Sequence, residues 1–166
     1  MLRHGDSKEV GTMFILLPTG IQIYYGDESW RSYKYSGCGD SDMQTRGDMN
    51  WGENTGVVAH WAKLGKFRKF NPAVGAGSQT TSGSTYIRKF TKTKASGIEA
   101  NTVAISLSSA SLSGLPYANG TTVYNWYDGK SATVQNGSVT FSGSSASTTA
   151  PVLCSDRNPA DYGVTF

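Results

Sequence analysis

The residues best suited to chemistry are six acidic side chains within one stretch of the sequence. They are Asp27, Glu28, Asp40, Asp42, Asp48 and Glu53. Two carboxyl groups on either side of one bond can serve as general acid and as base or nucleophile. Asp27 and Glu28 are adjacent at the end of a predicted strand, so their side chains point to opposite faces and cannot flank one bond. Nothing in the pattern holds the other four acids rigidly to one another.

The same stretch, residues 26–54, has no hydrophobic periodicity and contains several aromatic side chains. It is roughly 29 residues long, beyond the length of about 12–15 at which a loop without secondary structure is usually functional or disordered. Aromatic side chains argue against disorder, and the stretch holds Trp30, Tyr33, Tyr35 and Trp51. We therefore predict a functional loop.

Composition excludes several classes of function. The chain has 166 residues, enough for one ordinary domain or two small ones. It has no run of 18 apolar residues, so we expect no transmembrane helix and no membrane partner, and its first residues lack the apolar region of a signal peptide. The net charge of +3 is too small to indicate a polyanion. The basic and aromatic run 66–70 fits a solvated helix face better than a nucleic-acid patch, so we expect no nucleic-acid partner.

The two cysteines give no metal or cofactor prediction. Cys38 and Cys154 are far apart and match no metal-binding spacing. Nothing in the sequence brings them together, so both two free thiols and a disulfide remain open.

The first half of the sequence predicts helix, strand, loop and helix. Asp6 is a predicted N-cap with Glu9 at the third helical position, and the helix stops at Pro18. The short, β-branched and aromatic run 21–25 predicts a buried strand. A second helix is expected over 55–70, ended by Asn71 and Pro72. Its predicted inward face consists of Val57, Trp61, Leu64 and Phe67.

The second half has the pattern of an antiparallel β-domain. Runs rich in Val, Ile, Thr, Tyr and Phe predict strands over 85–90, 102–107, 121–127, 131–135, 138–141 and 151–154. Asp128-Gly129 and Asn136-Gly137 are typical two-residue hairpin turns. Residues 1–94 hold 13 of the 15 Lys and Arg residues, and this shift in charge also indicates two structural units.

Four segments, in order and at the expected spacing, resemble the α-amylase family of glycoside hydrolases. Residues 17–28, LPTGIQIYYGDE, resemble the last barrel strand, with Gln22 where many members have Pro, as in one bacterial branch. Residues 45–51, TRGDMNW, resemble the loop that follows this strand in that branch. Residues 59–68 and 71–77 resemble its last barrel helix and the entry into a C-terminal β-domain. The resemblance is specific over about residues 3–80, and only the position and pattern of the β-domain fit beyond that.

The resemblance implies an α+β fragment in two parts. Residues 1–73 are expected to form the terminal helix-strand-helix portion of a (β/α)8 barrel, and residues 74–154 an antiparallel β-sandwich of the Greek-key type. Residues 155–166 are expected to be a linker or the start of a further module. The strand over 21–25 would have no neighbouring strand, so we predict that residues 1–54 alone are marginally ordered or prone to aggregate.

The resemblance implies a retaining hydrolase or transglycosylase that acts on α-glucans such as starch, and the family's three essential carboxylates lie at the ends of earlier barrel strands. We therefore expect no catalytic residue here, and an inactive chain from a secreted or extracellular parent. The family's calcium ligands come mainly from a barrel insertion, so we expect no cofactor in this chain. The expected partners are an α-glucan and the missing N-terminal part of its own barrel. The residues expected to contact the glucan are Tyr25, Trp30, Tyr35, Arg46, Asp48 and Trp51.

These assignments have alternatives. The aromatic rings could pack the loop against the barrel instead of a sugar, and Arg46 with Asp48 could be an ion pair that orders the loop. Tyr124 and Trp126 share one face of a predicted strand and could form a sugar platform or fill the core. A sugar platform on the β-domain would make the chain a stand-alone carbohydrate-binding or surface-interaction module.

Overall fold

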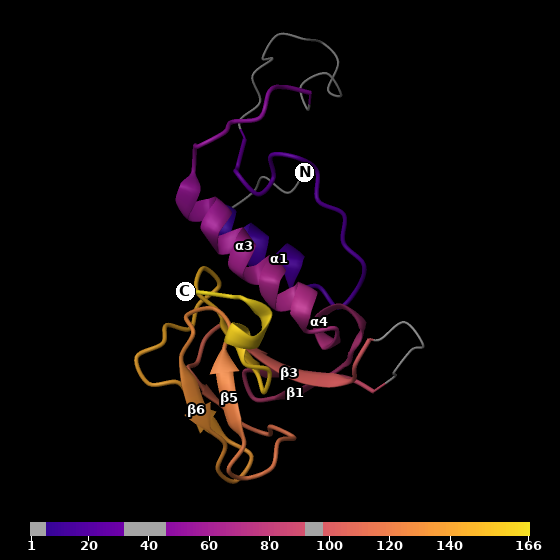
Figure 1. Ribbon diagram of the computed structural model, residues 1–166, viewed down its shortest axis with the longest axis vertical. Helices are drawn as coiled ribbons and strands as arrows, with labels where there is room; N and C mark the ends of the chain where they lie inside the picture. Colours follow the sequence, from indigo (N-terminus) through magenta and orange to yellow (C-terminus); the bar gives the residue numbers. More distant parts are fainter. Residues whose placement is uncertain (1–5, 32–45, 92–97) are drawn as a thin grey trace.

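The computed structural model describes residues 6–31, 46–91 and 98–166. Two helices, α1 (Ser7–Ile15) and α3 (Thr55–Phe70), lie side by side on one side of a β-sheet, and the short helix α4 (Ala73–Ala76) connects them to it (Figure 1). The Asp6 side chain accepts hydrogen bonds from the N–H groups of Lys8 and Glu9 at 2.8 and 3.2 Å, as predicted for an N-cap. No helix in the described ranges is both long and apolar enough to cross a membrane.

The sheet is antiparallel, and in the described part of the chain it has six strands in the order β1-β2-β3-β8-β5-β6. A two-stranded sheet, β4-β7, forms a further layer. The bounds are β1 Ser78–Ser82, β2 Thr85–Phe90, β3 Asn101–Ser106, β4 Ser111–Leu112, β5 Thr122–Asn125, β6 Ser131–Thr133, β7 Val139–Thr140 and β8 Val152–Ser155. The predicted antiparallel β-domain is thus confirmed in its strands, while the Greek-key connection stays a prediction.

The two faces of the large sheet support two separate cores because side chains alternate along each strand. Val103 and Ile105 of β3 and Leu153 of β8 pack against α1 and α3. Ala104 and Cys154 point the other way, toward β4 and β7. The helices therefore share one hydrophobic core with the sheet.

The predicted strand over residues 21–25 is not a strand, and this corrects our prediction. The segment has no ladder partner in the described ranges, and Ile23, Tyr24 and Tyr25 are exposed. A strand gains its stability from hydrogen bonds to a neighbouring strand and from cover on its faces. Among the described residues this segment has no partner strand, and only Ile21 packs against the core. Of the predicted helix-strand-helix arrangement the described residues therefore contain the two helices without the strand, and the assignment to a barrel stays a prediction.

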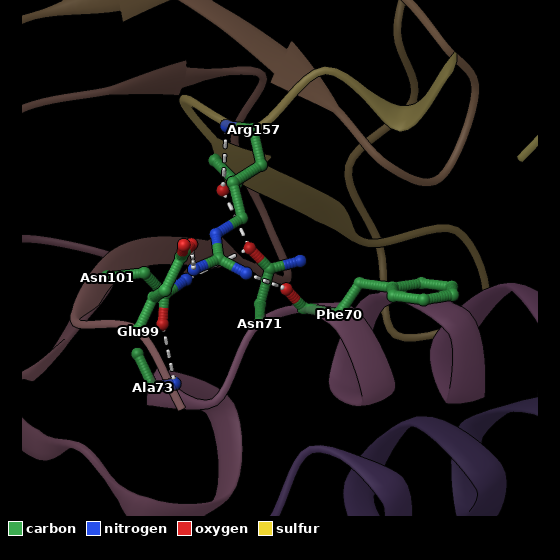
Figure 2. Close-up of polar contacts among 7 residues, drawn as sticks. Phe70, Asn71, Ala73, Glu99, Asn101 and Arg157 are labelled. Atoms are coloured by element: carbon green, nitrogen blue, oxygen red, sulfur yellow. Dashed lines mark hydrogen bonds and ion pairs between the residues drawn. The ribbon is translucent and has the colours of Figure 1, made fainter. Parts of the chain in front are cut away.

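A buried polar cluster joins the end of α3 to the sheet (Figure 2). The Asn71 Oδ1 atom accepts from Asn101 Nδ2 at 3.0 Å and from Ser155 Oγ at 2.7 Å. The Asn101 Oδ1 atom accepts from the Ala73 N–H at 2.8 Å, and Arg157 donates to the Phe70 carbonyl at 2.7 Å. These bonds satisfy the backbone at the point where the helix ends, so they fix the direction in which the chain enters the β-domain.

Residues near the C-terminus close over this joint. The 3-10 helix η1 (Pro159–Tyr162) places the Tyr162 ring 5.0 Å from that of Phe70 and 5.7 Å from that of Trp126, between centroids. Val164 is buried in the core shared with the helices. Residues 159–164 are therefore part of the packed structure, while the proposed boundary at residue 154 stays a prediction.

Candidate functional site

A groove of about 220 Å³ lies where residues 28–29 meet the N-terminal end of α3. Trp51 stands at this groove with 83% of its surface exposed, which is rare for so large an apolar side chain. Met49 and Val58 add apolar surface, while Glu28 and Glu53 supply carboxylates. The complete lining is Glu28, Ser29, Met49, Asn50, Trp51, Gly52, Glu53, Thr55 and Val58.

Buried hydrogen bonds hold the two sides of the groove together. The Ser29 hydroxyl donates to Asn50 Oδ1 at 2.6 Å, and Asn50 Nδ2 donates back to the Ser29 carbonyl at 3.2 Å. Asn54, at the N-cap of α3, also donates to the Ser29 carbonyl, at 2.8 Å. These bonds tie the segment after residue 26 to the segment that leads into α3.

The two groove carboxylates are each held by a donor. Glu28 Oε2 accepts from the Gly26 N–H at 3.0 Å, and Glu53 Oε2 accepts from Asn50 Nδ2 at 3.2 Å. Each carboxylate has a second oxygen that can accept a hydrogen bond from a ligand hydroxyl. Among the described residues, no group of three His, Cys, Asp or Glu side chains is placed to hold a metal ion.

Tyr25 connects the two segments at a second point. Its hydroxyl donates to the Gly47 carbonyl at 3.0 Å and accepts from the Gly47 N–H at 3.2 Å. The bond from the Gly47 N–H lowers the pKa of the Tyr25 phenol because it favours the phenolate. One ring face lies under the guanidinium of Arg31, 4.8 Å from the centroid. Tyr25 therefore holds the backbone of Gly47, which lies between Arg46 and Asp48 in the motif.

The other predicted contact residues are not all brought together. Arg46 and Asp48 are exposed on either side of Gly47, and no ion pair links them to each other. Trp30 is half-buried, has a positive φ of 53° and is not part of the groove lining. Tyr35 lies outside the described residues, as do Tyr33 and Cys38. Of the five predicted residues that the structure describes, Trp51 alone lines the groove.

Ser29, Asn50 and Glu53 were not predicted as site residues. Asn50 and Trp51 both belong to the motif over 45–51, so the motif was a usable signal for Asn50. Ser29 carries no such signal, because its role depends on a contact across 21 positions of sequence.

The alternative sugar platform on the β-domain is not available at Trp126. The Trp126 side chain is 1% exposed, its indole N–H donates to the Arg157 carbonyl at 2.9 Å, and its ring packs against Phe67 and Phe70. Tyr124 is half-buried against the same core. Trp126 therefore fills the core, and the stand-alone binding module loses the residue on which it depended.

Comparison with known proteins relates the chain to α-amylases. It is 44% identical over 85 residues to the periplasmic α-amylase of Escherichia coli (strain K12), a match that covers 49% of this chain and 12% of that protein. No family model matches the sequence. The resemblance stated from the motifs is thus confirmed by a relative that is much longer than this chain.

Solved structures share the fold at low identity. An α-amylase from Anoxybacillus matches with a TM-score of 0.59 and 19% identity, covering 90% of this chain and 32% of that one. AmyP in complex with maltose matches with a TM-score of 0.57 and 15% identity, covering 92% of this chain and 34% of that one. A variant of AmyP in complex with maltotriose gives a TM-score of 0.54 at 18% identity, with coverages of 92% and 35%. The chain thus spans about a third of the length of these proteins.

Proposed function

We propose that this chain, which resembles the C-terminal part of an α-amylase-family protein, belongs to a glycosidase that acts on α-glucans such as starch. In that enzyme it supplies part of the sugar-binding surface, and the catalytic carboxylates lie in another part of the protein. The observation that carries the proposal is the exposed indole of Trp51 beside a groove with two carboxylates.

The groove has the chemistry that a glucose unit needs. A pyranose ring presents a face of C–H groups that packs on an indole ring, and its edge presents hydroxyls that donate to carboxylates. Trp51 supplies the flat apolar surface, and Glu28 and Glu53 supply the acceptors. A pocket that is mainly apolar with a few placed polar groups is the usual form of a small-molecule site. The maltose and maltotriose complexes of AmyP support an α-glucan as the ligand class.

The remaining predicted residues complete the proposed surface. Arg46 and Asp48 lie on either side of Gly47 on the segment that leads to Trp51, and Tyr25 contacts Gly47 from the other segment. We propose that Arg46 and Asp48 contact a sugar unit next to the one on Trp51, and that Tyr25 orders their backbone. Trp30 and Tyr35 are proposed to contact the same oligosaccharide.

The proposed partner of the exposed apolar surface is the N-terminal part of the same protein. Ile23, Tyr24 and Tyr25 are each more than 40% exposed, and Met13 and Leu17 are also exposed. A run of exposed apolar residues is typical of a surface that another part of a structure covers. The relative in Escherichia coli is a periplasmic protein, and we propose that the parent of this chain also works outside the cytoplasm.

Calorimetric titration with maltoheptaose tests the proposal. We expect a Kd in the range of about 1 mM, equivalent to about −4 kcal/mol, and a loss of at least about tenfold in Trp51→Ala. Tyr86→Ala is the matched control because Tyr86 is an exposed aromatic residue on β2. Equal affinities for the unchanged protein and Trp51→Ala would contradict the sugar contact. Release of reducing ends from starch by this chain alone would contradict the placement of the catalytic carboxylates elsewhere.

A further inference from the structure

We infer that Ser29 and Asn50 are positioning residues that set the orientation of the Trp51 indole at the groove. The inference rests on the proposed function in one respect, which is that the groove takes a glucose unit. The orientation itself is a property of the protein and can be measured without a ligand.

Trp51 needs such support because its own side chain is hardly packed. Its exposure is 83%, and no ring or cation contact joins the Trp51 indole to another described side chain. Gly52, which follows it, has a φ of +79°, a conformation that glycine adopts freely. The position of the indole therefore depends on the backbone that carries it, and the residue before it, Asn50, is the nearest buried and hydrogen-bonded residue.

The side chain and the carbonyl of Asn50 are both held by hydrogen bonds. Its side chain is 5% exposed, accepts from Ser29 Oγ at 2.6 Å and donates to the Ser29 carbonyl and to Glu53 Oε2, both at 3.2 Å. Its carbonyl accepts from the Glu53 N–H at 3.2 Å, which closes the turn that carries Trp51. Asn50 thus holds the start and the end of this turn, while Ser29 holds Asn50.

Ser29 is anchored independently of the turn. Its side chain is buried, and its hydroxyl also lies 3.3 Å from the Gly26 carbonyl. Its own carbonyl accepts from Asn54 at the start of α3, at 2.8 Å. Ser29 and Asn50 therefore connect the turn that carries Trp51 to the start of α3, and this places the Trp51 backbone relative to Glu28 and Glu53.

Because Glu53 is a carboxylate, an aspartate cannot replace Asn50 without loss. An Asn50→Asp side chain keeps an acceptor for Ser29 Oγ. It places a carboxylate oxygen against Glu53 Oε2 and the Ser29 carbonyl, to each of which the amide now donates at 3.2 Å. Two carboxylates at that separation repel each other. The pair therefore takes up one shared proton more readily than a single carboxylate would. The defect in Asn50→Asp should therefore lessen in acid, where one O–H restores one of the two donated bonds, whereas a defect from a lost hydroxyl in Ser29→Ala should not.

Fluorine NMR of protein labelled with 5-fluorotryptophan provides the test. The chain has four tryptophans, and the Trp51 signal is identified by its loss in Trp51→Phe. In Ser29→Ala, and in Asn50→Asp at neutral pH, we expect the Trp51 signal to narrow and shift. Affinity for maltoheptaose should fall about fivefold, the effect of one or two lost hydrogen bonds. Below about pH 5 carboxylates take up protons. There the Trp51 signal and the affinity of Asn50→Asp should both approach the values of the unchanged protein at the same pH.

The signals of Trp61 and Trp126, both buried, report whether each variant is folded. Ser111→Ala, which removes a hydrogen bond to Thr140 on the other side of the sheet, is the matched control and should leave the Trp51 signal unchanged. An unchanged Trp51 signal in both Ser29→Ala and Asn50→Asp would overturn the inference. If the signal responds as expected but the unchanged protein does not bind maltoheptaose, the positioning stands and the proposed function fails.

Discussion

At the scale of single residues, His60 lies where α1, α3 and the β-domain meet. Its Nε2 donates to the Lys8 carbonyl at 2.8 Å and lies 2.9 Å from the Thr12 hydroxyl, while its Nδ1 lies 2.8 Å from the Tyr127 hydroxyl. The side chain is 2% exposed. Burial lowers the pKa of His60, with the Lys8 and Lys63 charges acting in the same direction and the Lys8 carbonyl and Asp6 opposing them.

This lowered pKa predicts that acid destabilises the protein through His60. Above its ordinary pKa of about 6.5 the imidazole is neutral in both the folded and the unfolded chain, so the full stability is present. As the pH falls below about 6.5, the unfolded state takes up the proton first, and the free energy of unfolding decreases. Urea titrations between about pH 7.5 and pH 5 should show this decrease and a smaller one in His60→Gln. Parallel pH profiles for the two proteins would contradict the assignment.

Cys154 gives a second prediction at this scale. Its thiol is buried in the core between β8, β4 and β7, and burial raises the pKa of the Cys154 thiol. Because the thiolate is the reactive form, Cys154 should resist alkylation by iodoacetamide in the folded protein and react in urea. Mass spectrometry of the peptide that contains Cys154 measures this. Rapid modification of Cys154 under native conditions would contradict the buried position.

At the scale of elements, two arginines hold the C-terminal end of α1. Arg68 Nη1 donates to the carbonyls of Ile15 and Leu17 at 2.8 Å each. Arg88 Nη1 donates to the Leu16 carbonyl at 2.5 Å and the Val74 carbonyl at 2.7 Å. Positive charge is favourable at a helix C-terminus, where the last carbonyls lack helical partners. Burial lowers the pKa of both guanidinium groups, and Arg68 lowers that of Arg88 further.

Arg88→Met should therefore destabilise the protein by about 3 kcal/mol. The methionine retains much of the packing but leaves the Leu16 and Val74 carbonyls without this donor, and Gln79 loses a bond of 2.9 Å. Lys89→Met is the control because Lys89 is exposed on the same strand. Chemical denaturation measures both, and equal midpoints would show that the arginine bonds contribute little.

The elements that sequence predicts well are those whose local pattern is sufficient. Helix α3 has the predicted bounds of 55–70, and Trp61, Leu64 and Phe67 form its buried face. Asn136 and Gly137 both have the positive φ that their hairpin requires. Strand β1 was missed because its sequence, SQTTS, is polar and it is defined by pairing with β2. The segment 21–25 was predicted as a strand from its β-branched and aromatic residues, but strand formation needs a partner that local pattern cannot supply.

The candidate site was predicted only in part for the same reason. Trp51 could be identified from its residue type and its motif, and the structure places it at the groove. The contacts that hold it join Ser29 to Asn50 and Asn54, across 21 and 25 positions. Such pairings depend on how two loops pack against each other, and the local pattern of a single sequence does not predict contacts between distant loops.

At the scale of the whole molecule, the helices and the β-domain are joined by a common core. Ile15 of α1, Leu64 of α3 and Ile105 of β3 belong to one buried cluster. The shift in charge along the sequence predicted two units, and the buried cluster shows that these units pack closely. In the folded chain α1 buries its apolar residues against α3 and the sheet, and the marginal order of residues 1–54 alone stays a prediction.

Removing the polar joint between the units should therefore destabilise both together. Asn71→Ala leaves Asn101 Nδ2, Ser155 Oγ and the Phe67 carbonyl without the partner that Asn71 supplies, at a cost of about 3 kcal/mol. Because α3 and β3 share a core, hydrogen exchange should accelerate by a similar factor in both elements. Asn119→Ala, at an exposed turn residue, should leave both rates unchanged. Faster exchange in α3 with unchanged exchange in β3 and β8 would mean that the two units unfold separately despite their shared core.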